Sequence, residues 1–227
     1  MLSIVLNGVT LRYFHFLVFF CLYFFETWAF SNASIPLVSF LTYAAGGVTL
    51  ILSAYVLKEK LTRVKVLSFG FVVFGVCLIF NYEFVVTGSY FGMFLALIGG
   101  LGYALFIFLS KFLKVGCGFS QLVWLFGFGS LYLFVPAVFS GPIEINYNAM
   151  VPIFFLVVFP TIGGFYFTTK AIEGSEAGKV QIIETSDPLF ATLFGFLIFG
   201  QILTIGSLWG ASCIVFGLLL VVLSKKK

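Results

Sequence analysis

The sequence predicts an all-α integral membrane protein with eight transmembrane helices. Of its 227 residues, 62% are hydrophobic and only 9% are charged, with a mean hydropathy of +1.19. No soluble core needs so much apolar surface, whereas a membrane protein does. The apolar residues also fall in continuous runs of the ~20 residues that cross a bilayer as a helix. These runs lack the alternation of polar and apolar residues that membrane strands require.

Eight apolar runs follow one another along the chain, separated by short connections. They cover residues 13–30, 35–57, 66–82, 90–110, 120–140, 149–169, 180–200 and 205–224. Each is long enough to cross the hydrocarbon core, with some tilt for the longer ones. Little sequence remains for a soluble domain.

All twelve Lys and Arg residues can be placed on one side of the membrane. They flank the runs on alternate turns only: Arg12, Lys58, Lys60, Arg63, Lys65, Lys111, Lys114, Lys170, Lys179, Lys225, Lys226 and Lys227. Because basic residues in short loops stay cytoplasmic, both termini should be cytoplasmic, and we expect a multi-pass protein of the plasma membrane. The expected partner of the chain is then the lipid bilayer, and the basic residues fix its orientation. Nowhere do they form a face for nucleic acid.

An internal repeat relates the first three runs to the last three. Identical or similar residues recur without a gap at an offset of 142 positions: Phe25 and Phe167, Thr27 and Thr169, Ala29 and Ala171, Glu59 and Gln201, Leu61-Thr62 and Leu203-Thr204, and Gly75 and Gly217. The basic loop 58–65 should be cytoplasmic, whereas its uncharged counterpart 200–207 should face the other side. The two copies are therefore predicted to insert upside down relative to each other.

The repeat divides the chain into two predicted domains. Residues 1–83 form an incomplete first copy of three helices, and residues 84–227 form a second copy of five. The counterparts of the runs 90–110 and 120–140 would lie before Met1. We therefore expect a complete molecule of this kind to carry two more helices at its N-terminus.

Inverted repeats are typical of secondary transporters, in which one half rocks against the other around a central site. The sequence thus predicts a transporter of small organic metabolites, working by alternating access. The alternative is a non-transporting or truncated subunit that needs a partner to complete the helix bundle. An intramembrane enzyme is not expected, because one His and one Asp supply neither a multi-His metal site nor an aspartyl pair. No cofactor is predicted.

Three acids lie within the apolar runs and are the first candidates for a substrate or coupling-ion site. They are Glu26, Glu184 and Asp187. Glu184 and Asp187 share a helix face, and Pro188 predicts a kink that frees backbone carbonyls beside them. This arrangement would suit a cation, a proton or an amine. Alternatively, the two acids pair with Lys170 or Lys179 and only hold helices together.

Three tyrosines are further candidates for the wall of a cavity, although ordinary packing explains each as well. They are Tyr43, Tyr103 and Tyr166. Small residues permit close helix contacts, and the pair Gly206 and Gly210 suggests either packing within the chain or the face of a homodimer.

Short sequence motifs mark the two copies. The second copy reads Asp187-Pro188-Leu189-Phe190-Ala191 and then Phe199-Gly200-Gln201-Ile202-Leu203-Thr204, and the first reads Leu57-Lys58-Glu59-Lys60-Leu61-Thr62 followed by Gly70 and Gly75. In these motifs the chain resembles the EamA-type proteins of the drug/metabolite transporter superfamily. The resemblance implies a ten-helix transporter of small metabolites, amino acids or drug-like compounds among them, without a cofactor. Two departures stand out: Gln201 replaces the acid of the motif, and Ala45-Gly46 aligns with Asp187-Pro188.

Overall fold

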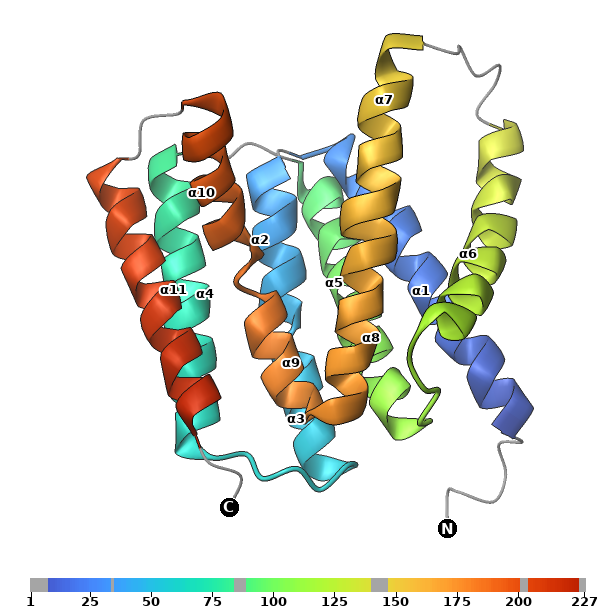
Figure 1. Ribbon diagram of the computed structural model, residues 1–227, viewed down its shortest axis with the longest axis horizontal. Coiled ribbons are helices and arrows are strands. Elements are labelled where there is room, and N and C mark those ends of the chain that lie inside the picture. Colours follow the sequence, from blue (N-terminus) through green and yellow to red (C-terminus); the bar gives the residue numbers. More distant parts are fainter. Residues whose placement is uncertain (1–7, 34, 84–88, 140–146, 201–203, 225–227) are drawn as a thin grey trace.

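The computed structural model describes residues 8–33, 35–83, 89–139, 147–200 and 204–224, and every regular element in these ranges is a helix (Figure 1). The elements are α1 (Gly8–Phe30), α2 (Ile35–Ala45), α3 (Gly47–Tyr55), α4 (Arg63–Glu83), α5 (Tyr90–Phe112), α6 (Phe119–Phe139), α7 (Tyr147–Leu156), the π-helical segment η2 (Val157–Gly164), α8 (Phe165–Gly174), α9 (Ala177–Glu184), α10 (Asp187–Phe199) and α11 (Ile205–Leu223). Figure 1 shows the N-terminal end of α1 and the C-terminal end of α11 at the same end of the bundle.

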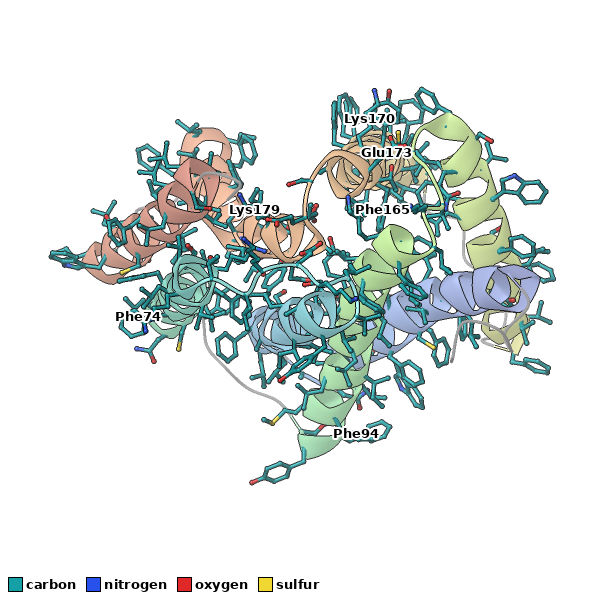
Figure 2. All side chains as sticks on the ribbon, turned by 90° about the horizontal axis from the view of Figure 1, so that it is seen from below. Phe74, Phe94, Phe165, Lys170, Glu173 and Lys179 are labelled. Atoms are coloured by element: carbon teal, nitrogen blue, oxygen red, sulfur yellow. The ribbon has the colours of Figure 1, made fainter. Side chains whose placement is uncertain are left out.

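Six segments of the described chain are long and apolar enough to cross a membrane. They are Leu37–Tyr55, Arg63–Asn81, Tyr90–Phe112, Phe119–Phe139, Met150–Gly174 and Ile205–Leu223. The outer surface is apolar as well: Phe74 and Phe94 point away from the bundle in Figure 2, with more than half of each side chain exposed. Such a surface suits lipid rather than water. The predicted spans 13–30 and 180–200 are not among the six and remain predictions.

The helices α4 and α11 begin in the same way. The hydroxyl oxygen of Thr62 accepts a hydrogen bond from the backbone N–H of Lys65 (3.3 Å), and that of Thr204 accepts one from Ser207 (3.1 Å). A threonine in this position satisfies a donor that the first turn of a helix leaves without a partner.

Glycines let α4 and α11 pack backbone to backbone. A methyl group built on Gly75 would lie 2.5 Å from the carbonyl oxygen of Gly210, and one built on Gly217 would lie 2.8 Å from that of Ser68. Both distances are too short for a contact between a Cβ atom and a carbonyl oxygen, so only glycine permits this approach of the two helices. Gly206 and Gly210 are buried within the chain, so a homodimer would have to use another face.

Two apolar stretches are each divided into two helices. The first breaks at Gly46, between α2 and α3, and the second breaks at Thr185 and Ser186, between α9 and α10. Pro188 is the second residue of α10, where its missing N–H leaves no helical hydrogen bond unmade. The chain changes course directly before this proline, between Glu184 and Asp187.

Helix α5 is the centre of the best packed part of the bundle. It lies against α1 and α2 through Gly99, Gly100 and Gly102, and Phe106 is fully buried against Phe19 of α1. The stretch from α7 to α8 contrasts with it, because no described residue from 150 to 167 is buried.

Candidate functional site

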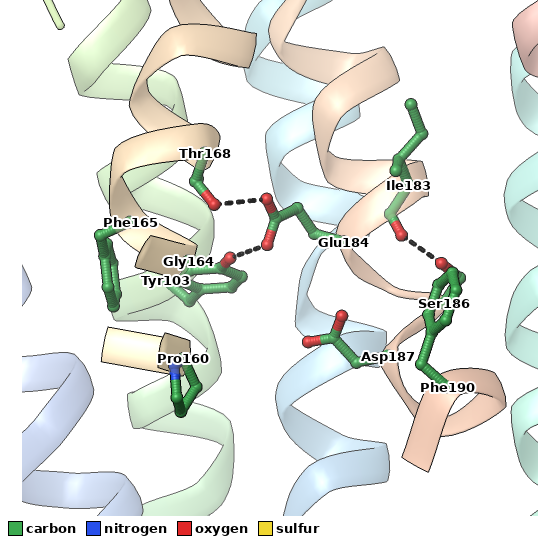
Figure 3. A pocket seen from close by; sticks show the side chains of 10 residues that line it. All are labelled: Tyr103, Pro160, Gly164, Phe165, Thr168, Ile183, Glu184, Ser186, Asp187 and Phe190. Atoms are coloured by element: carbon green, nitrogen blue, oxygen red, sulfur yellow. Dashed lines mark hydrogen bonds between the residues drawn. The ribbon is translucent and has the colours of Figure 1, made fainter. Parts of the chain in front are cut away.

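A cavity of about 490 Å³ opens between α5, η2, α8, α9 and α10 (Figure 3). Its described lining consists of Tyr103, Pro160, Gly164, Phe165, Thr168, Ile183, Glu184, Ser186, Asp187 and Phe190. A space of this size fits a small organic molecule. The only charged side chains in this lining are the two acids, so the cavity carries negative charge wherever they are ionised.

Glu184, the last residue of α9, is held by two hydroxyl groups. The Tyr103 hydroxyl of α5 donates to one carboxylate oxygen, and the Thr168 hydroxyl of α8 donates to the other at 2.7 Å (Figure 3). Hydrogen bonds to a carboxylate offset part of the cost of removing it from water. Glu184 thus joins three helices and fixes the position of its own carboxylate.

Asp187, the first residue of α10, is held less tightly. Its closest described donor is the Tyr43 hydroxyl, 3.5 Å from one carboxylate oxygen, at the outer limit of a hydrogen bond. Figure 3 shows Asp187 directed into the same space as Glu184. Its place at the N-terminus of α10 favours a negative charge there. Asp187 therefore keeps capacity to accept further hydrogen bonds from a ligand.

Glu26 of α1 lies outside this lining, next to Gly99 of α5. Of the three acids that the sequence analysis selected, Glu184 and Asp187 therefore come together in the cavity, and Glu26 does not.

Tyr166 does not line the cavity. Its ring stacks on Phe119, with 5.0 Å between the ring centroids, and the Lys170 ammonium lies 4.9 Å from the centre of the same ring. Lys179 donates to the carbonyl oxygen of Ser224 and lies 3.9 Å from Glu176. In the described part of the chain, no ion pair joins Glu184 or Asp187 to a lysine.

Sequence reasoning missed Thr168 and the pair of Gln181 and Thr49. Gln181 is fully buried, and its carbonyl oxygen accepts a hydrogen bond of 2.8 Å from the Thr49 hydroxyl. Its amide nitrogen has no hydrogen-bond partner and lies at the break beside Gly46. A glutamine within an apolar run, one turn before Glu184, was the available signal.

The chemistry of the cavity is that of binding. Among the described residues no three His, Cys, Asp or Glu side chains gather as metal ligands would. The two carboxylates can accept hydrogen bonds or hold a positive charge, and the aromatic and aliphatic walls can cover an apolar body.

Residues 90–223 match the model of the EamA-like transporter family, which is more than half of the chain. The chain belongs to this family. With its long apolar helices it is therefore an integral, multi-pass membrane protein. Membership also agrees with the prediction that the chain is not an enzyme.

Among curated relatives, an uncharacterized transporter of Clostridium kluyveri is 26% identical over 207 residues, covering 87% of this chain and 66% of its own length. Solute carrier family 35 member G1 of Homo sapiens is 25% identical over 201 residues, which cover 83% of this chain and 55% of the relative. The chain thus spans less than two thirds of each. A crystal structure with 14% sequence identity shares the fold, with a TM-score of 0.79 over 90% of this chain and 74% of that one.

Proposed function

We propose that this chain moves small organic solutes with an amine or another cationic group through the cavity at Glu184 and Asp187. The observation that carries the proposal is the lining of that cavity, in which both charged residues are acids. Charge inside a membrane is costly, so a positively charged solute that offsets the two carboxylates is favoured over an anion. The apolar walls suit the body of such a solute.

Alternating access would follow from an inverted repeat. The positions at which corresponding helices begin support such a repeat. Helices α2 and α9 begin at Ile35 and Ala177, and α4 and α11 begin at Arg63 and Ile205. Both pairs differ by the predicted 142 positions. The two capping hydrogen bonds, of Thr62 with Lys65 and of Thr204 with Ser207, obey the same offset.

The contact of α4 with α11 gives independent support. A methyl group on Gly75 would lie 2.7 Å from a side-chain carbon of Ile214, and one on Gly217 would lie 2.8 Å from a side-chain carbon of Val72. Adding 142 to Gly75 and Val72 gives Gly217 and Ile214, so each contact is the image of the other. Such paired contacts are what a two-fold axis in the membrane plane produces.

The broken helices are placed as alternating access would need. The break at Gly46 maps by the offset of 142 positions onto Pro188, two positions after the break at Thr185 and Ser186, so the two breaks correspond approximately. Discontinuous helices near the middle of the membrane commonly form the substrate site of transporters with inverted repeats. We propose division into a first copy at 1–83 and a second at 84–227, with both termini cytoplasmic and the chain in the plasma membrane.

Transport in proteoliposomes tests this function. Benzyltrimethylammonium and benzenesulfonate are similar in size, opposite in charge, and too polar to cross lipid unaided. We expect the chain to accelerate uptake of the cation over empty vesicles and to leave uptake of the anion unchanged. Preference for the anion would refute the proposed substrate class, because a negative cavity repels it.

A second candidate function is that of a subunit that must be completed by further helices. The stretch 150–167, in which no described residue is buried, and the partial coverage of both curated relatives favour it. Under this alternative the chain alone would fold and insert but move neither ion.

A further inference from the structure

A cluster of charged side chains ties the two halves of the chain together at the end of the bundle that carries both termini (Figure 1). Lys65, the third residue of α4, is only 4% exposed, and its ammonium lies 3.2 Å from the Glu176 carboxylate and 3.9 Å from that of Glu59. Lys179 lies 3.9 Å from Glu176 and donates a hydrogen bond of 3.0 Å to the carbonyl oxygen of Ser224, directly after α11. The cluster therefore joins the loop before α4, the starts of α4 and α9, and the end of α11.

The cluster also holds the short helix that carries an acid of the cavity. Helix α9 has eight residues, and Glu59 accepts hydrogen bonds from the backbone N–H groups of Ala177 and Gly178 at its start. Glu184, which lines the cavity, is its last residue. At 1.5 Å per residue the two ends lie about 10 Å apart. A helix this short moves as one piece, so a displacement of α9 that reshapes the cavity also pulls its start away from Glu59.

The corresponding positions at the opposite end of the bundle carry no charge. The counterparts of the four charged residues, 142 positions away, are all neutral: Gln201 for Glu59, Ser207 for Lys65, Ser34 for Glu176 and Leu37 for Lys179. Ser34 and Gln201 lie outside the described residues. The repeat therefore conserves the helices of this region but not the charges that join them.

Ser207 shows how the two ends differ. Its backbone N–H is capped by Thr204 in the same way as that of Lys65 is capped by Thr62. The Ser207 hydroxyl, however, shares a hydrogen bond of 2.7 Å with Thr204 in its own first turn, whereas the Lys65 side chain reaches Glu176 directly before α9. Equivalent backbone positions thus carry a side chain that bridges the two halves at one end only.

We propose that Glu59, Lys65, Glu176 and Lys179 form a latch that closes the bundle at the end of the two termini and breaks whenever the cavity opens there. The inference rests on the alternating access proposed above, in which the two ends open in turn. Ion pairs with partners on both halves stabilise only the state in which the halves meet. Because the other end lacks these charges, the balance favours the state that is open there. With cytoplasmic termini, that state is open to the outside.

The test measures from which side the cavity can be reached. Ile183 lines the cavity and is 45% exposed, so Ile183→Cys places a thiol there in a chain whose four native cysteines are replaced by alanine. A maleimide joined to polyethylene glycol, which does not cross lipid, is added to right-side-out or inside-out membrane vesicles. Labelling from either side is compared with labelling of the denatured protein.

Two variants weaken the latch, and one serves as the control. Glu176→Gln removes the closest charged partner of Lys65 at nearly equal size. Lys179→Met removes the contacts with Glu176 and Ser224 from a partly exposed position. The control is Lys60→Gln, at an exposed residue of the loop before α4.

We expect the parent thiol to react mainly from the outside. Glu176→Gln should raise its rate from the cytoplasmic side at least about fivefold, because removing one partner of a buried ion pair strongly destabilises the state that contains it. Lys179→Met should act in the same direction, and Lys60→Gln should leave the rate unchanged. Rates that do not differ between the latch variants and the control would overturn the proposal, even if the variants unfold at lower temperature, since a cluster that only staples the fold affects stability alone. A parent thiol that reacts mainly from the cytoplasmic side would overturn it too.

Labelling requires no transport, so the latch and the proposed function fail separately. A changed side of labelling without uptake of benzyltrimethylammonium would refute the proposed substrate class and leave the latch standing. Uptake of the cation with unchanged labelling would do the reverse.

Discussion

The carboxylate of Glu59 accepts a hydrogen bond of 2.8 Å from the backbone N–H of Ala177, the first residue of α9. Its second oxygen accepts another from Gly178 at 3.2 Å. One acid from the loop before α4 thus caps a helix 118 positions later, and the helix dipole favours its negative charge. The neighbouring Lys65 is 4% exposed and lies 3.2 Å from Glu176 and 3.9 Å from Glu59. This cluster holds the start of the helix that ends at Glu184.

Replacing Glu59 should loosen the start of α9. Glu59→Ala removes both hydrogen bonds and one partner of the buried Lys65, so we expect a loss of about 1–2 kcal/mol of stability. Glu59→Gln keeps one hydrogen-bond acceptor and should therefore lose less stability than Glu59→Ala. Thermal unfolding in detergent measures the difference, with Lys60→Ala at an exposed neighbour as the control. Equal unfolding temperatures for Glu59→Ala and Lys60→Ala would contradict the capping role.

Two glycines of α4 form a matched pair for testing the contact with α11. An added methyl group at Gly75 would lie 2.5 Å from the Gly210 carbonyl oxygen, whereas one at Gly70 meets nothing within 4 Å. We expect Gly75→Ala to cost about 1–3 kcal/mol, because it forces the helices apart. Gly70→Ala should be neutral, or stabilising by up to about 1 kcal/mol through helix propensity. Gly75→Ala should therefore unfold at a lower temperature than Gly70→Ala. An equal change in the unfolding temperature of both variants would contradict the close packing of α4 against α11.

The existence of the helices could be predicted from the sequence, because apolar runs of membrane length have few other structures open to them. The breaks could not be placed to the residue. Gly46 gives no stronger signal than glycines inside intact helices, and Pro188 marks the second break, at Thr185 and Ser186, only to within a few residues. A glycine can interrupt a helix or allow a close contact between two helices. Which of the two occurs depends on its neighbours in space, and no local sequence pattern reveals them.

The candidate site was predicted in part. Glu184 and Asp187 were selected because a carboxylate inside a membrane is costly and therefore usually has a function. Both line the cavity, together with Tyr103. Thr168 was missed, because a threonine in an apolar run is ordinary and its bond to Glu184 depends on how α8 meets α9. Tyr166 resembled the other tyrosines in sequence, but its helix turns it toward Phe119.

The two acids of the cavity should be needed for transport and not for folding. We expect Glu184→Gln and Asp187→Asn each to lower uptake of benzyltrimethylammonium at least about tenfold, since a lost charge interaction in a desolvated site is worth 1.4 kcal/mol or more. Thr168→Val removes one donor to Glu184 but keeps the charge, so it should lower uptake less. The measurement is uptake of benzyltrimethylammonium into proteoliposomes that contain equal amounts of each variant. Full activity of the double acid variant would reduce both residues to structural roles.

The close approach of Gly46 to Gln181 should make these two residues depend on each other. A methyl group on Gly46 would lie 2.4 Å from the Gln181 amide nitrogen, so Gly46→Ala must displace that side chain and break its hydrogen bond with Thr49. We expect a loss of about 2 kcal/mol from this clash and the lost bond. Gln181→Ala removes the side-chain part of this obstacle, whereas the Tyr43 carbonyl oxygen stays 2.9 Å from the added methyl group. The double variant should therefore be more stable than the sum of the single losses predicts, by at least about 0.5 kcal/mol. Unfolding of all four proteins in one detergent measures this coupling, and strictly additive losses would show that the break at Gly46 does not depend on the glutamine.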